Sequence, residues 1–241
     1  MYKGWRRALT QDKERFLRRV PLFEGLEQPH LKALAEKTTE RSFKKGEVLF
    51  FEGEPGDALY IVNTGTVKVY RVAEDGREKT LALLGAGEFF GEMALLDEGP
   101  RSAIAETLEP CELYLLHRND FLATLGENPS IALQIIRVLS LRIRQMNAQI
   151  MDIVFRDVRG RVASTLVDLC NRHGVPTPSG KRIDLKLTHQ ELANLVGTAR
   201  ETVSRILAEL QDLHCLTVDG RYLVLKDMKK LEEYAAGAYS P

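Results

Sequence analysis

Residues 188–207 constrain the fold of this chain more than any other segment. Their sequence, THQELANLVGTARETVSRIL, contains two helix-start signals ten positions apart. Each signal is a threonine followed three residues later by a glutamate, Thr188 with Glu191 and Thr198 with Glu201, which is the pattern of a capping box. The segment therefore predicts two short helices in immediate succession.

The residues between the two signals favour a tight turn. Gly197 can adopt the left-handed backbone conformation that such a turn requires, and the small Ala193 allows two helices to approach closely. The spacing predicts a helix-turn-helix, with a helical hairpin that has no DNA role as the alternative. The apolar contacts between the two helices are predicted to come from Leu192, Val196, Val203 and Ile206.

The second helix of a helix-turn-helix enters the major groove with its N-terminal residues facing the base edges. Arginine pairs well with guanine, and glutamate accepts from the amino group of cytosine. A surface ion pair between Glu201 and Arg205, four positions apart, is the structural alternative, and both roles can hold together. The predicted DNA-contacting residues are Thr188, Thr198, Arg200, Glu201, Ser204, Arg205 and Arg221.

Two β segments follow the helix-turn-helix. They span residues 216–218 and 221–225 and are separated by Asp219-Gly220, a dipeptide typical of two-residue hairpin turns. This pattern predicts the wing of a winged helix, with Arg221 near the phosphate backbone.

The first half of the chain has a different character. Short β-type segments between Phe43 and Phe121 are broken by regularly spaced glycines, which predicts a small antiparallel barrel or sandwich. Residues 74–77 (EDGR) form a predicted hairpin turn, and residues 28–37 a short helix.

A long helix is predicted to begin at Asn128-Pro129, with asparagine as the cap and proline at the first helical position. Its apolar positions recur at intervals of three and four, as in a coiled-coil seam, which predicts a symmetric dimer. Packing on its own domain is the alternative. The helix is expected to end near residues 154–157, and residues 174–180, with two prolines, are expected to form an exposed loop. The seam consists of Ile136, Leu139, Ile143, Met146, Ile150 and Ile153.

The amino-acid composition excludes several classes of protein but does not by itself indicate a function. Residues 156–241 hold 13 Lys and Arg against 11 Asp and Glu, too small an excess to identify a nucleic-acid binder. No apolar run is long enough for a membrane span or signal core, so we expect a cytoplasmic protein. The three cysteines are far apart, which favours buried thiols over disulfides or zinc. No nucleophile elbow, metal-ligand spacing or Walker-type loop indicates an enzyme.

The densest group of special residues lies at 87–103. A short helix starting behind Gly91, together with Arg101 and Ser102, could bind a phosphate. Glu92 would repel that phosphate, so its expected task is to accept a hydrogen bond from a sugar hydroxyl. Taken alone, the Glu92/Arg101 combination also fits a structural ion pair.

Residues 87–103 resemble the phosphate-binding cassette of cyclic-nucleotide-binding domains. The whole order from about Leu22 to Leu225 is similar to the cyclic AMP receptor protein (catabolite activator) and fumarate-nitrate regulator superfamily, as are residues 157–161, 200–203 and Arg205. The resemblance implies an α+β fold: an N-terminal cyclic-nucleotide-binding β-roll over residues 1–127, a dimerisation helix over 128–155, and a C-terminal winged helix-turn-helix over 156–241.

The resemblance also implies ligands and partners. The expected effector is cyclic AMP, and the expected partners are double-stranded DNA with inverted TGTGA-like repeats, a second copy of the chain, and RNA polymerase. Met146 stands where better-known members have threonine, and this supports the alternative of a vestigial or retuned sensor that is active without cyclic AMP. Whether the regulator activates or represses stays open. The implied ligand-binding residues are Gly91, Glu92, Met93, Ala94, Arg101, Ser102 and Asn147.

Two branches of the superfamily are disfavoured by particular residues. An iron–sulfur sensor would need an N-terminal group of cysteines, and no cysteine precedes Cys111. A haem sensor would need a histidine within the roll, where His117 at a strand end is the one present. No metal, haem or iron–sulfur cofactor is therefore expected.

Overall fold

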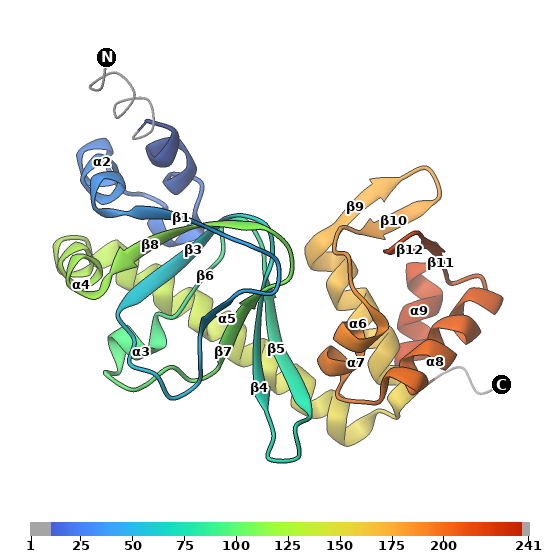
Figure 1. Ribbon diagram of the computed structural model, residues 1–241. Coiled ribbons are helices and arrows are strands. Elements are labelled where there is room, and N and C mark those ends of the chain that lie inside the picture. The colour runs from blue at the N-terminus through green and yellow to red at the C-terminus, as the bar shows by residue number, and fades with distance from the viewer. Residues whose placement is uncertain (1–10, 238–241) are drawn as a thin grey trace. The chain divides into compact units, whose positions relative to one another are not determined.

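A computed structural model describes residues 11–237 of the chain. These residues divide into two compact units, which we describe separately (Figure 1). The first contains the residues up to Arg71 together with Thr80–Arg142, and the second contains Val72–Lys79 together with the residues from Ile143 onward.

The first unit is built on two four-stranded sheets, which confirms the predicted antiparallel β architecture (Figure 1). One sheet has the order β1-β8-β3-β6 and the other the order β2-β7-β4-β5. The 74–77 turn, within the segment Val72–Lys79 that is grouped with the second unit, joins β4 to β5. Gly76 adopts a positive φ of 81° there, as expected for an Asp-Gly turn. The strands are β1 (Thr39–Phe43), β2 (Val48–Phe50), β3 (Ala58–Thr64), β4 (Val67–Val72), β5 (Glu78–Leu84), β6 (Phe89–Phe90), β7 (Ile104–Thr107) and β8 (Cys111–His117).

Strand β3 shows how side-chain alternation builds two cores. Tyr60 and Val62 face an apolar cluster between the sheets, which also contains Phe50 and Phe90. Leu59 and Ile61 point to the opposite face, where helices cover the sheet. The covering elements are helical residues 11–17, the 3-10 turn η1 (Pro21–Phe23), α2 (Gln28–Lys37) as predicted, α4 (Arg118–Glu127) and the beginning of α5 (Pro129–Phe155).

Helix α5 confirms the predicted long helix. Asn128 precedes it, and its side-chain amide donates to the carbonyl of Thr124 at 3.0 Å, at the end of α4. The predicted seam is exposed, with Ile136, Ile143, Met146, Ile150 and Ile153 each more than half accessible. Leu139 differs, because it packs partly buried against the core of its own unit.

The second unit contains α6 (Val158–His173), α7 (His189–Val196), α8 (Arg200–Asp212) and α9 (Met228–Ala235) around the sheet β11-β12-β10-β9 (Figure 1). The predicted wing is confirmed as β11 (Leu216–Asp219) and β12 (Tyr222–Leu225). Its turn consists of Gly220 and Arg221, one residue later than predicted, because Asp219 pairs with Tyr222.

Two features of the second unit depart from the sequence prediction. Residues 174–180 are not a free loop, since β9 (Gly174–Thr177) pairs with β10 (Gly180–Ile183). The two prolines are compatible with this, because β9 is an edge strand. Helix α9 was not predicted; Asp227 caps its first turn by accepting from the amide of Lys230 at 3.0 Å.

Cys111, Cys170 and Cys215 are free and buried, as predicted, and burial raises the pKa of each thiol. No helix within residues 11–237 is long and apolar enough to cross a membrane.

Candidate functional site

The predicted phosphate-binding segment forms a compact corner between β6 and β7. Gly91 has a φ of 81°, and a Cβ there would lie 2.5 Å from Nη1 of Arg101. A Cβ at Gly56 would lie 2.5 Å from the Cβ of Ala94. These two glycines allow the chain to close tightly around Arg101 and the short helix α3 (Met93–Leu96).

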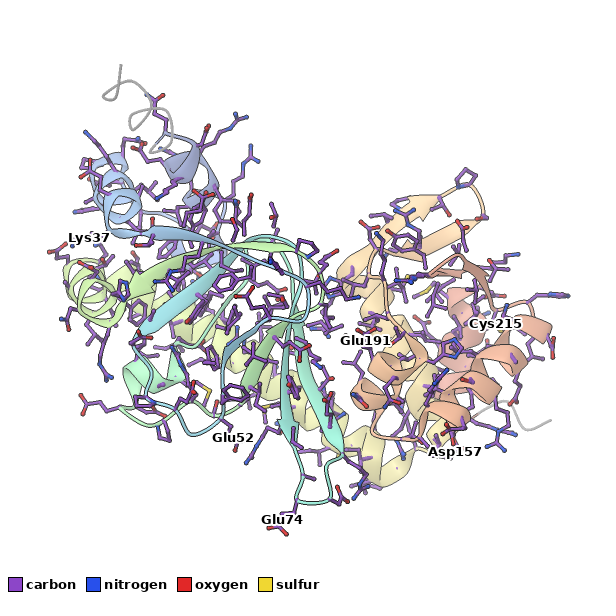
Figure 2. The ribbon with its side chains drawn as sticks, viewed as in Figure 1. Lys37, Glu52, Glu74, Asp157, Glu191 and Cys215 are labelled. Atoms are coloured by element: carbon purple, nitrogen blue, oxygen red, sulfur yellow. The ribbon has the colours of Figure 1, made fainter. Side chains whose placement is uncertain are left out.

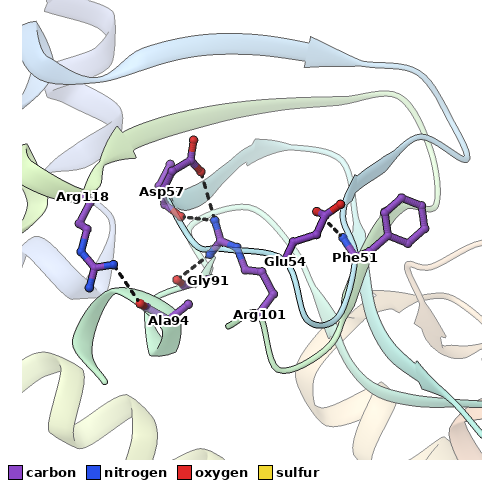
Figure 3. Close-up of polar contacts among 8 residues, drawn as sticks. Phe51, Glu54, Asp57, Gly91, Ala94, Arg101 and Arg118 are labelled. Carbon is purple, nitrogen blue, oxygen red and sulfur yellow. Dashed lines mark hydrogen bonds and ion pairs between the residues drawn. The ribbon is translucent and has the colours of Figure 1, made fainter. Parts of the chain in front are cut away.

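Arg101 lies deep in this corner (Figure 3). Its guanidinium donates to the carbonyls of Gly91 at 2.8 Å and Ala58 at 2.9 Å. It also faces Asp57 at 3.5 Å, with its Cζ 4.3 Å from the centre of the Phe50 ring. Arg101 therefore has a structural role that the sequence did not indicate, because it joins two segments of backbone as well as carrying charge.

Glu92 is buried, and its partner comes from α5. Arg142 donates to Oε1 of Glu92 at 2.6 Å and also to the carbonyl of Phe89. Arg142 was not predicted as a site residue, although it lies four residues before Met146 on the same helix. The alternative interpretation, an ion pair between Glu92 and Arg101, is not formed among the described residues, since Glu92 pairs with Arg142.

Two atoms of this corner are buried within the described residues without a hydrogen-bond partner. One is Nε of Arg101, a donor, and the other is Oε2 of Glu92, an acceptor. Burial lowers the pKa of Arg101 and raises that of Glu92, where the charge of Arg142 opposes the shift. The corner thus presents one unused donor and one unused acceptor.

The remaining predicted ligand residues lie as follows. Ser102 is exposed, and its Oγ lies 3.7 Å from Sδ of Met93, which is also exposed. Arg118 supports the other end of α3, where it donates to the carbonyl of Leu95 at 3.3 Å and to that of Ala94 (Figure 3). Asn147 is exposed on the part of α5 that belongs to the second unit, so its role in ligand binding stays a prediction.

The helix-turn-helix has the predicted first helix and turn. The amide of Glu191 donates to Oγ1 of Thr188 at 3.1 Å, and the Glu191 carboxylate accepts from the amide of Thr188, which completes the capping box. Glu191 is labelled in Figure 2. Gly197 has a φ of 79° and ends α7, as predicted. The four apolar contact residues and Ala193 are buried.

The second predicted capping box is wrong. The N-cap of α8 is Ala199, without a side-chain cap. The amide of Thr198 donates instead to the carbonyl of Ala193 at 3.1 Å. Thr198 therefore completes the C-terminal cap of α7 after Gly197, and is one position too early to cap α8.

The predicted base-reading residues are accessible. Arg200, Glu201 and Arg205 are exposed on the first turns of α8, and Glu201 and Arg205 form no ion pair among the described residues. Ser204 is half-buried; its Oγ lies 2.7 Å from Nδ1 of His189, which links α8 to α7. This role of His189 was not predicted, because no sequence motif indicates it.

Comparison with known proteins gives a consistent result across the chain. Residues 40–128 match the model of the cyclic nucleotide-binding domain, and residues 160–234 match that of the Crp-like helix-turn-helix domain. The chain is 36% identical to the CRP-like cAMP-activated global transcriptional regulator of Mycobacterium tuberculosis, over 92% of this chain and 99% of that protein. It is 37% identical to the cyclic AMP receptor protein of Thermus thermophilus, over 90% and 97%.

A solved structure extends the comparison to three dimensions. The c-di-GMP responsive global regulator CLP of Xanthomonas campestris superposes with a TM-score of 0.72 at 30% sequence identity. The superposition covers 83% of this chain and all of that one.

Proposed function

We propose that this chain, which belongs to the family of Crp-like transcription regulators, is a homodimeric regulator gated by cyclic AMP. The family membership rests on its cyclic nucleotide-binding domain and its Crp-like helix-turn-helix. Its DNA targets are inverted repeats with TGTGA-like half-sites, and RNA polymerase is a further partner. It acts in the cytoplasm, and its predicted domain boundaries lie at residues 127/128 and 155/156.

The observation that carries this proposal is the pair of unused buried atoms in the cassette. A cyclic nucleotide offers a phosphate oxygen that can accept from Nε of Arg101, and a ribose hydroxyl that can donate to Oε2 of Glu92. Nε of Arg101 requires a hydrogen-bond acceptor, and Oε2 of Glu92 requires a hydrogen-bond donor. A cyclic nucleotide supplies both groups in one molecule.

The second candidate is a sensor tuned to another ligand or to none. Met146 supports it, because methionine cannot supply the hydroxyl that threonine offers a base. The similarity to a c-di-GMP responsive regulator supports it as well. Calorimetric titration with cyclic AMP, cyclic GMP and cyclic di-GMP separates the candidates. Under the primary proposal, cyclic AMP binds more tightly than the other two; tighter binding of another nucleotide, or binding of none, favours the alternative.

The exposed seam of α5 supports the dimer. Five large apolar side chains recur along one stripe of the helix, and a second copy of the same stripe can cover them. A two-fold dimer presents two recognition helices, so the half-sites should lie about 34 Å apart, one turn of DNA.

Operator binding tests the gating. We expect saturating cyclic AMP to tighten DNA binding, and operator DNA to tighten cyclic AMP binding by the same factor, because linkage is reciprocal. Equal operator affinity with and without cyclic AMP would remove this nucleotide as the effector. Replacement of Arg205 by alanine should cost about 1–3 kcal/mol per half-site and relax preference at one G·C pair.

A further inference from the structure

The junction between α5 and α6 is a short segment whose side chains contact the helices around it. Arg156 and Asp157 alone separate the end of α5 from the start of α6. Asp157 caps α6 by accepting from the amide of Gly160 at 2.8 Å. Arg156 has no part in the function proposed above, and the residues around this junction all belong to the second unit.

Arg156 joins the end of α5 to the end of α9. Its Nε pairs with Oδ1 of Asp152, one turn earlier on α5, at 2.8 Å. Its Nη1 donates to the carbonyl of Ala235, the last residue of α9, at 2.6 Å. The last carbonyls of a helix lack donors within that helix, and a cation beside them is favoured. One guanidinium therefore ties together two helices that are far apart in the sequence.

Helix α6 takes part in the same junction. The Oγ of Ser164 donates to Oδ2 of Asp152 at 2.7 Å, so both oxygens of this carboxylate have a partner. Gly160, on the first turn of α6, allows the end of α9 to come close. A Cβ at this position would lie 3.1 Å from the carbonyl oxygen of Ala235, which is closer than an ordinary van der Waals contact. The ends of α5, α6 and α9 are therefore fixed to one another at this junction.

The other polar contacts of α9 lead to the recognition helix α8 (Figure 1). The hydroxyl of Tyr234 donates to Oε1 of Glu209 on α8 at 2.7 Å. The Nζ of Lys230 donates at 2.9 Å to the carbonyl of Leu213, the residue that follows α8. Oε2 of Glu209 also lies 3.6 Å from Nε of Arg159, near the start of α6. Helix α9 therefore connects α8 with the junction at Arg156.

We propose that Arg156 is a positioning residue which, together with α9, sets the direction of the recognition helix α8 relative to the long helix α5. The inference rests on the proposed DNA-binding function. In a two-fold dimer the seam of α5 relates the two copies, and α8 reads the DNA. A rotation of α8 against α5 therefore changes the separation and the angle of the two recognition helices. Arg156 contacts no DNA in this proposal, because it acts through Ala235 and the rest of α9.

The structural alternative is a local ion pair that stabilises the last turn of α5 and nothing else. Asp152 and Arg156 are four residues apart, a spacing at which exposed pairs contribute little to stability. Two contacts favour the wider role. Arg156 also binds the carbonyl of Ala235 on α9, and Asp152 also binds Ser164 on α6. An ion pair confined to α5 requires neither contact.

The spacing between the half-sites provides a test that stability alone does not affect. One base pair inserted into the operator moves one half-site by about 3.4 Å and rotates it by roughly 35°. We expect the unaltered protein to bind such an operator at least about tenfold more weakly, because the DNA must be twisted to fit two firmly held recognition helices. R156Q should reduce this penalty to about threefold or less, because recognition helices that are held less firmly can follow the changed site. R156K, which keeps a cation between Asp152 and Ala235, should give an intermediate penalty. The penalty is a ratio of two affinities of the same preparation, so a partly unfolded sample does not change it.

Arg172 supplies the matched control. It pairs with Asp168 on α6 at 2.8 Å, also at a spacing of four residues. R172Q therefore removes an ion pair of the same length and spacing within a single helix, and it should keep the full spacing penalty. An equal relaxation in R172Q and R156Q would overturn the proposal, since the loss of any such ion pair would then explain both results.

A second variant perturbs the same contact without a change of charge. G160A places a methyl group 3.1 Å from the carbonyl oxygen of Ala235. The resulting displacement of the end of α9 should relax the spacing penalty as R156Q does, and this variant carries the test if R156Q does not fold. The full penalty in both G160A and the folded arginine variants would overturn the proposal.

The dependence of affinity on salt separates positioning from a direct contact with DNA. R156Q should keep the slope of log K against log salt, whereas the loss of one phosphate contact would make the slope shallower by about 0.9. A shallower slope would overturn the proposal and assign Arg156 to the DNA surface. Failure of the proposed function looks different, because the unaltered protein would then bind the operator at no spacing.

Discussion

Replacement of Arg101 by alanine should damage the first unit as well as its ligand site. The sequence alone suggests that R101A would abolish nucleotide binding and leave the fold intact. The structure changes this expectation, because the buried guanidinium donates to the carbonyls of Gly91 and Ala58 and packs on Phe50. Alanine would leave two carbonyls without their donor.

The size of the effect follows from these contacts. A hydrogen bond to a charged group contributes about 1.5–3 kcal/mol, so two of them amount to about 3–6 kcal/mol. Part of this is offset, because burial disfavours the charged guanidinium and lowers the pKa of Arg101, and truncation removes that desolvation cost. We expect a net loss of about 2–4 kcal/mol, against a total stability of about 5–15 kcal/mol for a domain. R101K should be intermediate, because an ammonium lacks the planar fork of donors.

Urea unfolding measures the loss of global stability. Hydrogen exchange of the amides in β3 and β6 measures the loss of local stability around Arg101. Cyclic AMP at a hundred times its dissociation constant should stabilise the unaltered protein by about 2.7 kcal/mol, and R101A should gain nothing at the same concentration. A destabilisation under about 1 kcal/mol would refute the structural role. Ligand-induced stabilisation retained in R101A would refute the binding role.

Three further predictions follow from the structure. Glutamates at Ile143 and Ile150, both more than half exposed, should convert dimers to monomers in sedimentation without unfolding either unit, whereas a persistent dimer would relocate the interface. Thr188→Ala should cost about 1 kcal/mol of stability in urea unfolding, and Thr198→Ala much less, because only the Thr188 side chain caps a helix; equal costs would restore the second capping box. Burial raises the pKa of Glu92, so between the ordinary and the raised pKa the native state keeps a proton that the unfolded chain has lost, and stability should fall as pH rises through that window. In E92Q, the free energy of unfolding should no longer fall with pH in this window. An unchanged dependence on pH would contradict the burial of an ionisable Glu92.

Much of the fold could be predicted because it rests on local signals. The Asp-Gly turn at 75–76, the left-handed Gly197 and the Thr188 capping box each specify backbone geometry within a few residues. The second capping box failed for an instructive reason. Thr198 and Glu201 have the correct spacing, but the cap that follows Gly197 uses the amide of Thr198, so α8 begins one residue later.

The polar partners within the site could not be predicted in this way. Fifty residues separate Arg142 from Glu92, and 43 separate Arg101 from Ala58. No local pattern specifies such pairs, because they depend on which helix packs against which sheet corner. Arg182 and Tyr222 show the same limitation, since the Arg182 guanidinium lies over the Tyr222 ring only through the pairing of β10 with β12.

The contacts of α5 within the first unit suggest how a ligand could act on the long helix. Ile131 and Ile135 anchor its beginning in the apolar core, and two turns later Arg142 is held by the Glu92 carboxylate and by the carbonyl of Phe89. Ile131 and Ile135 make only apolar contacts with the core. Arg142, in contrast, directly contacts Glu92, a predicted ligand-binding residue. A ribose hydroxyl donating to Glu92 would change the charge distribution on the carboxylate that holds Arg142. A ligand shifts a conformational equilibrium only through a difference in its interactions with the two states, and the Glu92–Arg142 pair is a contact where such a difference can arise. Because Arg142 lies within the seam, directly before the exposed Ile143, a change in this pair would reach the proposed dimer surface of α5 without passing through another element.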